Sequence, residues 1–435
     1  MADTTDISGR RMLKMNFQHG VKSLHLWAFF PLCWTGIMLA SFMPASQAYL
    51  FTEFLDVPYK DHGKLGGSLA FWGEILFLIV AGLWGALSDR IGRRRVIATA
   101  FTLMAIGIFS YSRAETVAQL YPGRLIFSAG AAAYSVMIIA LVADYAMDDS
   151  RGKLTGWLGV FNGLGAMVAV LVFTRIPKIM QAQGLGPIEA GMVMYMVVIA
   201  IAIVTALIAW FGLKKNEVQH AEHKVGMKES FTDGFKAGKN PRILLAYAAG
   251  FISRGNLTIV GTFFILWLSN YGSEIGMNRA DAFARGGMVV GIAQFFALLG
   301  APVFGIMCDR MDRVTALMIA LAFSAVGYCG TYWVADPFSG AMIACAAMIG
   351  IGEVAVIITS AVLIAEEAPA RVRGSVIGFF TICGALGIMV AAKIGGHLFD
   401  EWNPVGPFVL FGGFALVVGI WAFILRARNK RNVAG

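Results

Sequence analysis

Three ionisable residues lie deep inside apolar stretches of the chain and are the first candidates for chemistry. Glu74, Arg254 and Glu353 each stand 12 to 15 positions from a charged residue at the end of the same stretch. At a helical rise of about 1.5 Å per residue, these separations place all three about 18–22 Å from one side of a membrane. A charged side chain at the bilayer centre costs at least about 2.5 kcal/mol, so each needs a partner, a cavity or a function.

The arginine and the two acids indicate a proton-coupled binding site. Arg254 and Glu353 share a level near the midplane, and a solute that binds to the arginine would release the acid to take up a proton. Cationic residues at membrane level (Arg124, Arg254 and Lys393) outnumber the two acids, which favours an anionic or zwitterionic solute. Two structural alternatives stay open: a buried ion pair of Arg254 and Glu353 that fixes helix packing, and a Glu74 that is structural or faces lipid.

A charged hairpin between two apolar stretches is the second candidate site. It runs from Gly85 to Arg95, and a weaker copy from Gly305 to Arg313 follows 220 positions later. A carboxylate in such a turn can accept from the N-terminus of a neighbouring helix, while its arginines pair with acids at nearby helix ends. We expect these contacts to form a latch that holds one conformation and breaks in another. The predicted latch residues are Gly85, Asp89, Arg90, Arg93, Asp144, Asp309, Arg310, Arg313 and Glu366.

Within this latch, Asp144 is the expected partner of Arg90 or Arg93. Glu366 is the expected partner of Arg310 or Arg313.

The amino-acid composition indicates which kind of helix carries these residues. The 435-residue chain is 58% hydrophobic and 14% charged, against about 25% charged in typical soluble domains. Apolar runs of about 20 residues, enough to cross a hydrocarbon layer of about 30 Å, recur throughout. We therefore expect an all-α membrane protein with twelve transmembrane helices, embedded in a lipid bilayer.

The distribution of Lys and Arg predicts the orientation in the membrane. About 25 of these residues fall on one side of the predicted spans and about seven on the other. By the positive-inside rule, both termini, the central loop and both hairpins are cytoplasmic. The basic residues lie in short clusters between apolar segments, which argues against nucleic-acid binding. The short loops fit a multi-pass protein of a bacterial inner membrane.

The chain is predicted to consist of two related halves. Asp144, Arg151 and Gly156 recur as Glu366, Arg373 and Gly378, each 222 positions later, and paired six-helix halves are a known transporter architecture. The predicted parts are an N-terminal segment (1–23) that is cytoplasmic and suited to the membrane surface, a six-helix bundle (24–213), a linker (214–242), a second bundle (243–425) and a basic tail (426–435).

The first hairpin resembles the signature loop of the major facilitator superfamily. The matching residues follow the pattern Gly85-x-x-x-Asp89-Arg90-x-Gly92-Arg93-Arg94, and the two-half plan extends the resemblance over the whole chain. The second copy departs from the pattern because Asp312 stands where glycine is expected. Gly123 and Arg124 are similar to the arginine motif of the family's fourth helix, although Ser128 replaces a usual glycine.

The resemblance implies roles for residues in spans 1, 4, 7 and 10, which line the central cavity in this family. It makes Arg254 and Glu353 facing candidates there. Glu74, in span 2, remains the second proton-coupling candidate, although in the family this helix often lies between the cavity and lipid. The predicted substrate-binding residues are Arg254, Asn256, Trp34, Gln47, Tyr134 and Trp267. Arg124, near the outer end, is read as an outer gate, with a substrate-attracting or snorkelling charge as alternatives.

These features predict a secondary active transporter that works by alternating access, as a monomer. The sequence has no Gly-Lys-Ser/Thr phosphate-binding loop, and neither its five Cys nor its six His show metal-ligand spacing. We therefore expect no enzyme activity, cofactor or metal, and expect a small-molecule substrate and protons as partners. The alternatives are a proton-coupled multidrug efflux pump and a non-transporting receptor built on a transporter frame.

Overall fold

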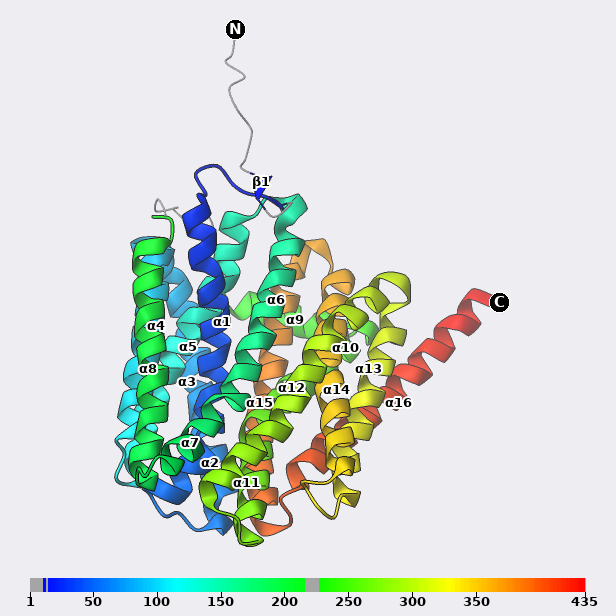
Figure 1. Cartoon of the computed structure of the whole chain (residues 1–435). Coiled ribbons are helices and arrows are strands. Elements are labelled where there is room, and N and C mark those ends of the chain that lie inside the picture. The colour runs from blue at the N-terminus through cyan, green and yellow to red at the C-terminus, as the bar shows by residue number, and fades with distance from the viewer. Residues whose placement is uncertain (1–10, 13–14, 216–226, 435) are drawn as a thin grey trace. The chain divides into compact units, whose positions relative to one another are not determined.

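The computed structural model describes residues 11–12, 15–215 and 227–434, and nearly all of them are helical (Figure 1). Twelve segments of this described chain are long and apolar enough to cross a membrane. The predicted count of twelve spans is thereby confirmed. The segments are Ser23–Phe54, Tyr59–Ile91, Arg93–Ser112, Val117–Tyr145, Ser150–Ala182, Pro187–Gly212, Pro241–Glu274, Arg279–Arg310, Arg313–Trp333, Gly340–Glu367, Ala370–Glu401 and Gly406–Ala427.

The first six spans follow a short β-hairpin, β1 (Arg11–Met12) and β2 (Met15–Asn16). Their elements are α1 (Ser23–Ala45), α2 (Gln47–Tyr49), η1 (Leu50–Phe54), η2 (Tyr59–Asp61), α3 (His62–Ile91), α4 (Arg93–Ser112), α5 (Val117–Tyr145), α6 (Asp148–Leu171), η3 (Phe173–Arg175), α7 (Ile176–Ala182) and α8 (Pro187–Gly212).

The last six spans follow a linker helix, α9 (Met227–Ala237). Their elements are α10 (Pro241–Thr258), η4 (Ile259–Phe264), α11 (Ile265–Glu274), α12 (Arg279–Arg310), α13 (Arg313–Gly330), η5 (Thr331–Trp333), α14 (Gly340–Glu367), η6 (Ala370–Val372), α15 (Arg373–Glu401) and α16 (Gly406–Ala434). Side-chain caps begin three of these helices: Asn240 caps α10, Asn278 caps α12 and Asp312 caps α13.

The first and seventh spans are interrupted in the same way. Each contains a short π-helical turn, η1 in the first span and η4 in the seventh. Such turns are rare and occur frequently at functional sites. The two halves of the sequence therefore share a structural irregularity as well as the hairpin motif.

The described residues form two compact units that do not coincide with the two sequence halves. The first unit takes its residues from Met1–Met43, Ile75–Ala169 and Met192–Glu222. The second takes them from Pro44–Glu74, Val170–Gly191 and His223–Gly435. The second unit thus combines the last six spans with the adjoining ends of spans 1 and 2 and of spans 5 and 6.

The described part of the N-terminal segment packs two of its side chains against the protein, while residues 18–20 are exposed. Met15 and Phe17 are each 1% exposed. The Asn16 amide donates to Ser150 Oγ at 2.8 Å, and the Met147 amide donates to the Asn16 carbonyl at 3.1 Å. This stretch is therefore attached to the turn between α5 and α6. Residues 1–10 and 13–14 of the predicted N-terminal segment, 216–226 of the predicted linker and 435 of the tail lie outside the described residues.

Candidate functional site

The first hairpin positions one of its arginines against an acid at the end of α5. Gly92, between α3 and α4, has a φ of 90°, a conformation that suits glycine and places Arg93 at the start of α4. Arg93 Nε lies 2.5 Å from Asp144 Oδ2, and its Nη1 lies 3.6 Å from Asp89 Oδ1. Arg90 is exposed. Arg93, rather than Arg90, is thus the arginine that contacts Asp144.

Gly85 lies in α3 of the same hairpin. A Cβ at this position would stand 3.8 Å from Val136 Cγ1 on α5, an ordinary van der Waals distance. The packing at this position therefore leaves room for a small side chain.

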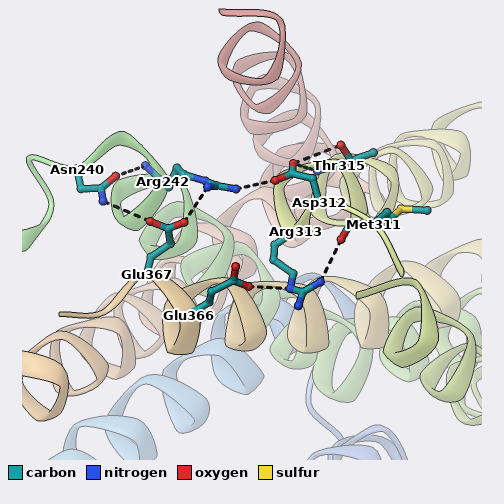
Figure 2. Close-up of polar contacts among 8 residues, drawn as sticks. All are labelled: Asn240, Arg242, Met311, Asp312, Arg313, Thr315, Glu366 and Glu367. Carbon is teal, nitrogen blue, oxygen red and sulfur yellow. Dashed lines mark hydrogen bonds and ion pairs between the residues drawn. The ribbon is translucent and has the colours of Figure 1, made fainter. Parts of the chain in front are cut away.

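The second hairpin makes the corresponding contact in the second half of the sequence (Figure 2). Arg313 Nε lies 2.7 Å from Glu366 Oε2, while Asp309 and Arg310 are exposed. Asp312 has a φ of −56°, so this turn does not need the left-handed conformation of its counterpart Gly92. Its carboxylate instead accepts from the Thr315 amide at 3.1 Å. The departure from the glycine pattern is therefore accompanied by a helix cap.

Arg242 extends this second hairpin into a network that the sequence did not predict. Its Nη2 lies 2.6 Å from Asp312 Oδ1 and its Nη1 lies 3.0 Å from Glu367 Oε1 (Figure 2). Asn240 Nδ2 also approaches Glu367 Oε2 at 3.4 Å. One arginine thereby joins the starts of α10 and α13 to the end of α14. The acid at position 312, in place of glycine, was the sequence signal for such a partner.

We expect replacement of Arg242 by glutamine to lower stability by about 1–2 kcal/mol, because two partly exposed carboxylates lose a shared charged donor. The thermal unfolding midpoint of the purified protein is the measurement. Arg310→Gln removes the same charge from an exposed position of the same hairpin region and should leave the midpoint unchanged. Equal midpoints for the two variants would show that the network does not stabilise the fold.

Arg254 and Glu74 provide a pair of charges in the middle of the spans. Arg254 lies on α10 and is exposed in the structure. Glu74 of α3, half-buried, is close enough for its charge to act on this guanidinium. Gly384 of α15 leaves room for the arginine, because a Cβ there would lie 2.7 Å from Arg254 Cγ. All three residues belong to the second unit.

Glu353 lies in a different polar cluster, so the expected contact between Arg254 and Glu353 is not found. Asn256, two positions after Arg254 and therefore about 200° around the helix, donates from Nδ2 to Ser324 Oγ at 3.1 Å. Tyr328 donates to the Asn256 carbonyl at 3.3 Å, and the charge of Glu353 acts on this tyrosine. Arg254 thus lies on one side of α10, and the cluster that contains Glu353 lies on the opposite side.

Two oxygens of this cluster lack a hydrogen-bond partner among the described residues. They are Glu353 Oε2 and Asn256 Oδ1, on side chains that are 5% and 0% exposed. An ionised carboxylate without a partner is costly in a protein interior, whereas a neutral acid costs much less.

The remaining predicted substrate-binding residues are covered by protein to different degrees. Tyr134 is 3% exposed and donates to the Cys33 carbonyl at 3.2 Å. Trp34, like Tyr134 in the first unit, is half-buried. Gln47 is fully buried in the second unit, and its amide has no partner among the described residues. Trp267 is 6% exposed, with its ring 5.5 Å from that of Phe408. Of the six, Arg254 is the one whose side chain is exposed.

Arg124, predicted as an outer gate, lies in the first unit. It is half-buried on α5, and its guanidinium carbon stands 6.0 Å from the centre of the Phe127 ring. Arg124 takes no part in the contacts of Asp400, Arg279 and His62 that join the two sequence halves inside the second unit.

One of these contacts is a clamp at the end of the spans opposite the hairpins. The Asp400 carboxylate, at the end of α15, accepts from the amides of Gly63 at 2.7 Å and Lys64 at 2.6 Å, in the first turn of α3. Lys64 Nζ lies 2.9 Å from Glu401 Oε1. We call these four residues the Asp400 clamp. A carboxylate is favoured here because the first amides of a helix lack intrahelical partners.

Two further contacts join the same ends of the sequence halves. Arg279, at the start of α12, donates to the Thr52 carbonyl at 3.0 Å and lies 3.9 Å from Glu53 Oε2. The ring of His62, which is fully buried, lies 3.0 Å from Asn270 Oδ1 through Nδ1. Spans 1 and 2 are therefore held to spans 7, 8 and 11 inside the second unit.

The fold and the charged hairpins define a polytopic helical membrane transporter, and comparison with known proteins identifies the family. The model of the Major Facilitator Superfamily matches residues 32–392, with a second match over 248–435. The chain belongs to the major facilitator superfamily. It is accordingly a multi-pass membrane transporter of small molecules, and not an enzyme.

Relatives and solved structures agree with this assignment. The chain is 26% identical to magnetosome protein MamH of Paramagnetospirillum magneticum, over 90% of each protein. It is 25% identical to magnetosome protein MamZ of Magnetospirillum gryphiswaldense, but spans 61% of that protein's length. It is 22% identical to multidrug resistance protein 2 of Bacillus subtilis, over 88% of this chain and 91% of the relative.

Two solved transporters have the same fold. A variant of the nucleoside transporter NupG matches with a TM-score of 0.74 and 16% identity, over 92% of this chain and 99% of the other. A D-xylose-proton symporter matches with a TM-score of 0.66 and 15% identity, over 92% and 97%.

Proposed function

We propose that this transporter moves an anionic or zwitterionic organic solute that binds to Arg254. The observation that carries the proposal is an exposed guanidinium in the middle of a membrane span, with Glu74 as a nearby charge. The planar guanidinium group presents parallel donors that match carboxylate and phosphate groups. A charge at this depth is costly and marks a substrate or ion pathway in membrane proteins.

We propose Glu74 and Glu353 as the proton carriers. A solute anion that binds to Arg254 would take over the role of the Glu74 charge, and Glu74 could then accept a proton without leaving the arginine uncompensated. Glu353 is supported by its burial and by an oxygen without a partner among the described residues. The neutral acid suits that environment, and ionisation would require the cluster to rearrange.

In this proposal the hairpins and the Asp400 clamp stabilise opposite ends of the spans. Arg93 with Asp144, and Arg313 with Glu366, stabilise one arrangement of the helix ends at the hairpins. The clamp stabilises the ends far from the hairpins. The distribution of Lys and Arg favours a cytoplasmic position for the hairpins. We further propose that the protein works as a monomer in a bacterial inner membrane. Each hairpin pair lies within one sequence half, whereas the clamp joins the two halves, and all of these contacts are formed together in the structure. Alternating access then requires the clamp to break when the two halves separate at that end.

The proposal is tested first by ligand binding. Purified protein is screened by thermal shift against organic anions, zwitterions and hydrophobic cations at two pH values. A stabilising anion or zwitterion should lose its effect in Arg254→Gln and keep it in Lys393→Gln, a matched variant of another exposed cation within a span. The proposal fails if the ligand stabilises Arg254→Gln as well as the wild type.

Flux measurements then separate the candidate functions. Uptake of the radiolabelled ligand into proteoliposomes, dependent on a pH gradient, supports a proton-coupled carrier. The relative named multidrug resistance protein 2 supports a second candidate, efflux of hydrophobic compounds. That candidate predicts stabilisation by hydrophobic cations that survives Arg254→Gln. Binding without flux would indicate a receptor. The names of the magnetosome relatives state no solute.

A further inference from the structure

A cavity of about 630 Å³ lies within the second unit at the end opposite the hairpins. It opens between α7 and the first turns of α12, two neighbouring helices labelled in Figure 1. None of its residues belongs to the site around Arg254. Its lining combines positive charge with apolar surface, so it suits a ligand that carries both an anionic group and a hydrocarbon part.

The charged part of the cavity has an excess of cations. Arg175, Lys178 and Arg285 line it together with a single carboxylate, Asp281. Lys178 Nζ lies 2.8 Å from Asp281 Oδ1, so this pair is neutral. Arg175 and Arg285 are exposed, and neither takes part in an ion pair with any residue that the structure describes. The guanidinium carbon of Arg285 stands 4.5 Å from the centre of the Phe338 ring, a contact that does not neutralise its charge. Three cations and one acid leave a net charge of two, carried by the two arginines.

The apolar part of the cavity reaches into the membrane along α12. Met288 and Ile179, which both line the cavity, are 40% and 50% exposed. Met288 follows Arg285 into the span, whereas Ile179 lies beside Arg175 toward the end of span 5. The 32-residue helix α12 is about 48 Å long at about 1.5 Å per residue, so its ends extend about 9 Å beyond a hydrocarbon layer of about 30 Å. Arg285 stands six positions into this helix, at the boundary, and Met288 nine positions into it, below the boundary.

We propose that this cavity binds the headgroup of an anionic phospholipid from the adjacent membrane leaflet. The phosphate would lie between Arg175 and Arg285, the upper part of an acyl chain would cover Met288, and Ile179 would contact the apolar part of the lipid next to the headgroup. Charge complementarity selects an anionic lipid over a zwitterionic one, since a choline or ethanolamine group would meet the same arginines. A free inorganic anion would leave the apolar lining of the cavity uncovered. The bound lipid would connect the end of span 5 to the start of span 8.

The test uses the full chain in detergent, with native mass spectrometry during titration with phosphatidylglycerol or phosphatidylcholine. The wild type should bind phosphatidylglycerol preferentially. Each basic residue near an anionic headgroup contributes roughly a fivefold gain in binding, so the double variant Arg175→Gln with Arg285→Gln should raise the half-saturating phosphatidylglycerol concentration about tenfold or more. Retention of wild-type binding by that variant would overturn the proposal.

Two controls make the outcome specific. Arg113→Gln removes an exposed arginine from the end of α4, also stacked on an aromatic ring, and should bind lipid as the wild type does. Restoration of phosphatidylglycerol preference by Arg175→Lys with Arg285→Lys would show that charge, rather than a damaged fold, is responsible. Equal binding of both lipids by the wild type, or full displacement of phosphatidylglycerol by millimolar inorganic phosphate, would contradict a lipid site.

Discussion

The Asp400→Asn variant is expected to release the end of α3 from the end of α15. The wild-type carboxylate accepts two backbone amides, from Gly63 and Lys64, in the first turn of a helix. Each hydrogen bond to a charged group contributes about 1.5–3 kcal/mol to stability. An asparagine oxygen can still accept, but the negative charge at the helix N-terminus is lost. We expect the clamped arrangement to lose about 3 kcal/mol relative to arrangements without the clamp.

Such a loss corresponds to a change of about a hundredfold in the equilibrium between clamped and unclamped molecules, since about 1.4 kcal/mol is a factor of ten. Spin labels at Lys60 and Asn403, both exposed, would report the distance between the two ends in reconstituted protein. The wild type should give one short distance. The Asp400→Asn variant should add a population at longer distance.

Glu401→Gln is the matched control for this variant. It also removes a negative charge from the clamp, but the ion pair of Glu401 with Lys64 is largely exposed, with side chains 63% and 39% accessible. Exposed pairs contribute about 0–1 kcal/mol, so the distance distribution should stay close to that of the wild type. An Asp400→Asn distribution identical to that of Glu401→Gln would mean that the clamp does not hold the ends together.

The sequence predicted the architecture because the signals for it are local. Each span is a run of apolar residues, and its length and charged ends can be read without knowledge of its neighbours. The hairpins could be located for the same reason. The Arg242 network was missed because Arg242 looked like the end of a linker, and its partner Asp312 lies 70 positions away.

The sequence predicted the depth of the central charges but not the direction in which they point. Counting residues along a helix gives the level of Arg254 and Glu353, and the resemblance to the family made them facing candidates. The side of the helix that each residue occupies depends on packing, and spans that are apolar all round carry little periodicity to reveal it. Asn256, with its bond to Ser324, shows which side of α10 faces α13.

The Asp400 clamp could not be predicted because it joins segments 336 and 337 positions apart. Two of its contacts also use backbone amides, which carry no sequence signal. The adjacent acids Asp400 and Glu401 at the end of a span were the visible sign, but a sequence alone does not tell a clamp from residues that lie in the headgroup region.

Neutralising Glu74 should destabilise the protein far more than neutralising Glu353. Glu74→Gln leaves Arg254 without the charge that acts on it, and a charged side chain at the middle of a membrane span costs about 2.5 kcal/mol. Arg254→Gln should cost a similar amount by leaving Glu74 alone. The double variant Glu74→Gln with Arg254→Gln should recover most of the loss, because neither charge remains.

Thermal or denaturant unfolding of the four proteins in this cycle gives a coupling energy, which we expect to exceed about 1 kcal/mol. The matched cycle replaces Glu74→Gln by Glu353→Gln, the same chemical change at a similar depth in a cluster on the other side of α10. Its coupling to Arg254→Gln should be near zero. Coupling of equal size in the two cycles would show that Arg254 responds to the overall charge of the spans rather than to Glu74.

Ligand binding distinguishes a structural pair from a binding site in the same proteins. If the two charges only fixed helix packing, the double variant, with its stability recovered, should still bind the solute that stabilises the wild type. We expect it to lose that binding, because the guanidinium is the group that recognises the anion. A double variant that regains its stability but does not bind the solute cannot be explained by a packing role alone. That result would show that the exposed Arg254 in the middle of span 7 recognises the solute.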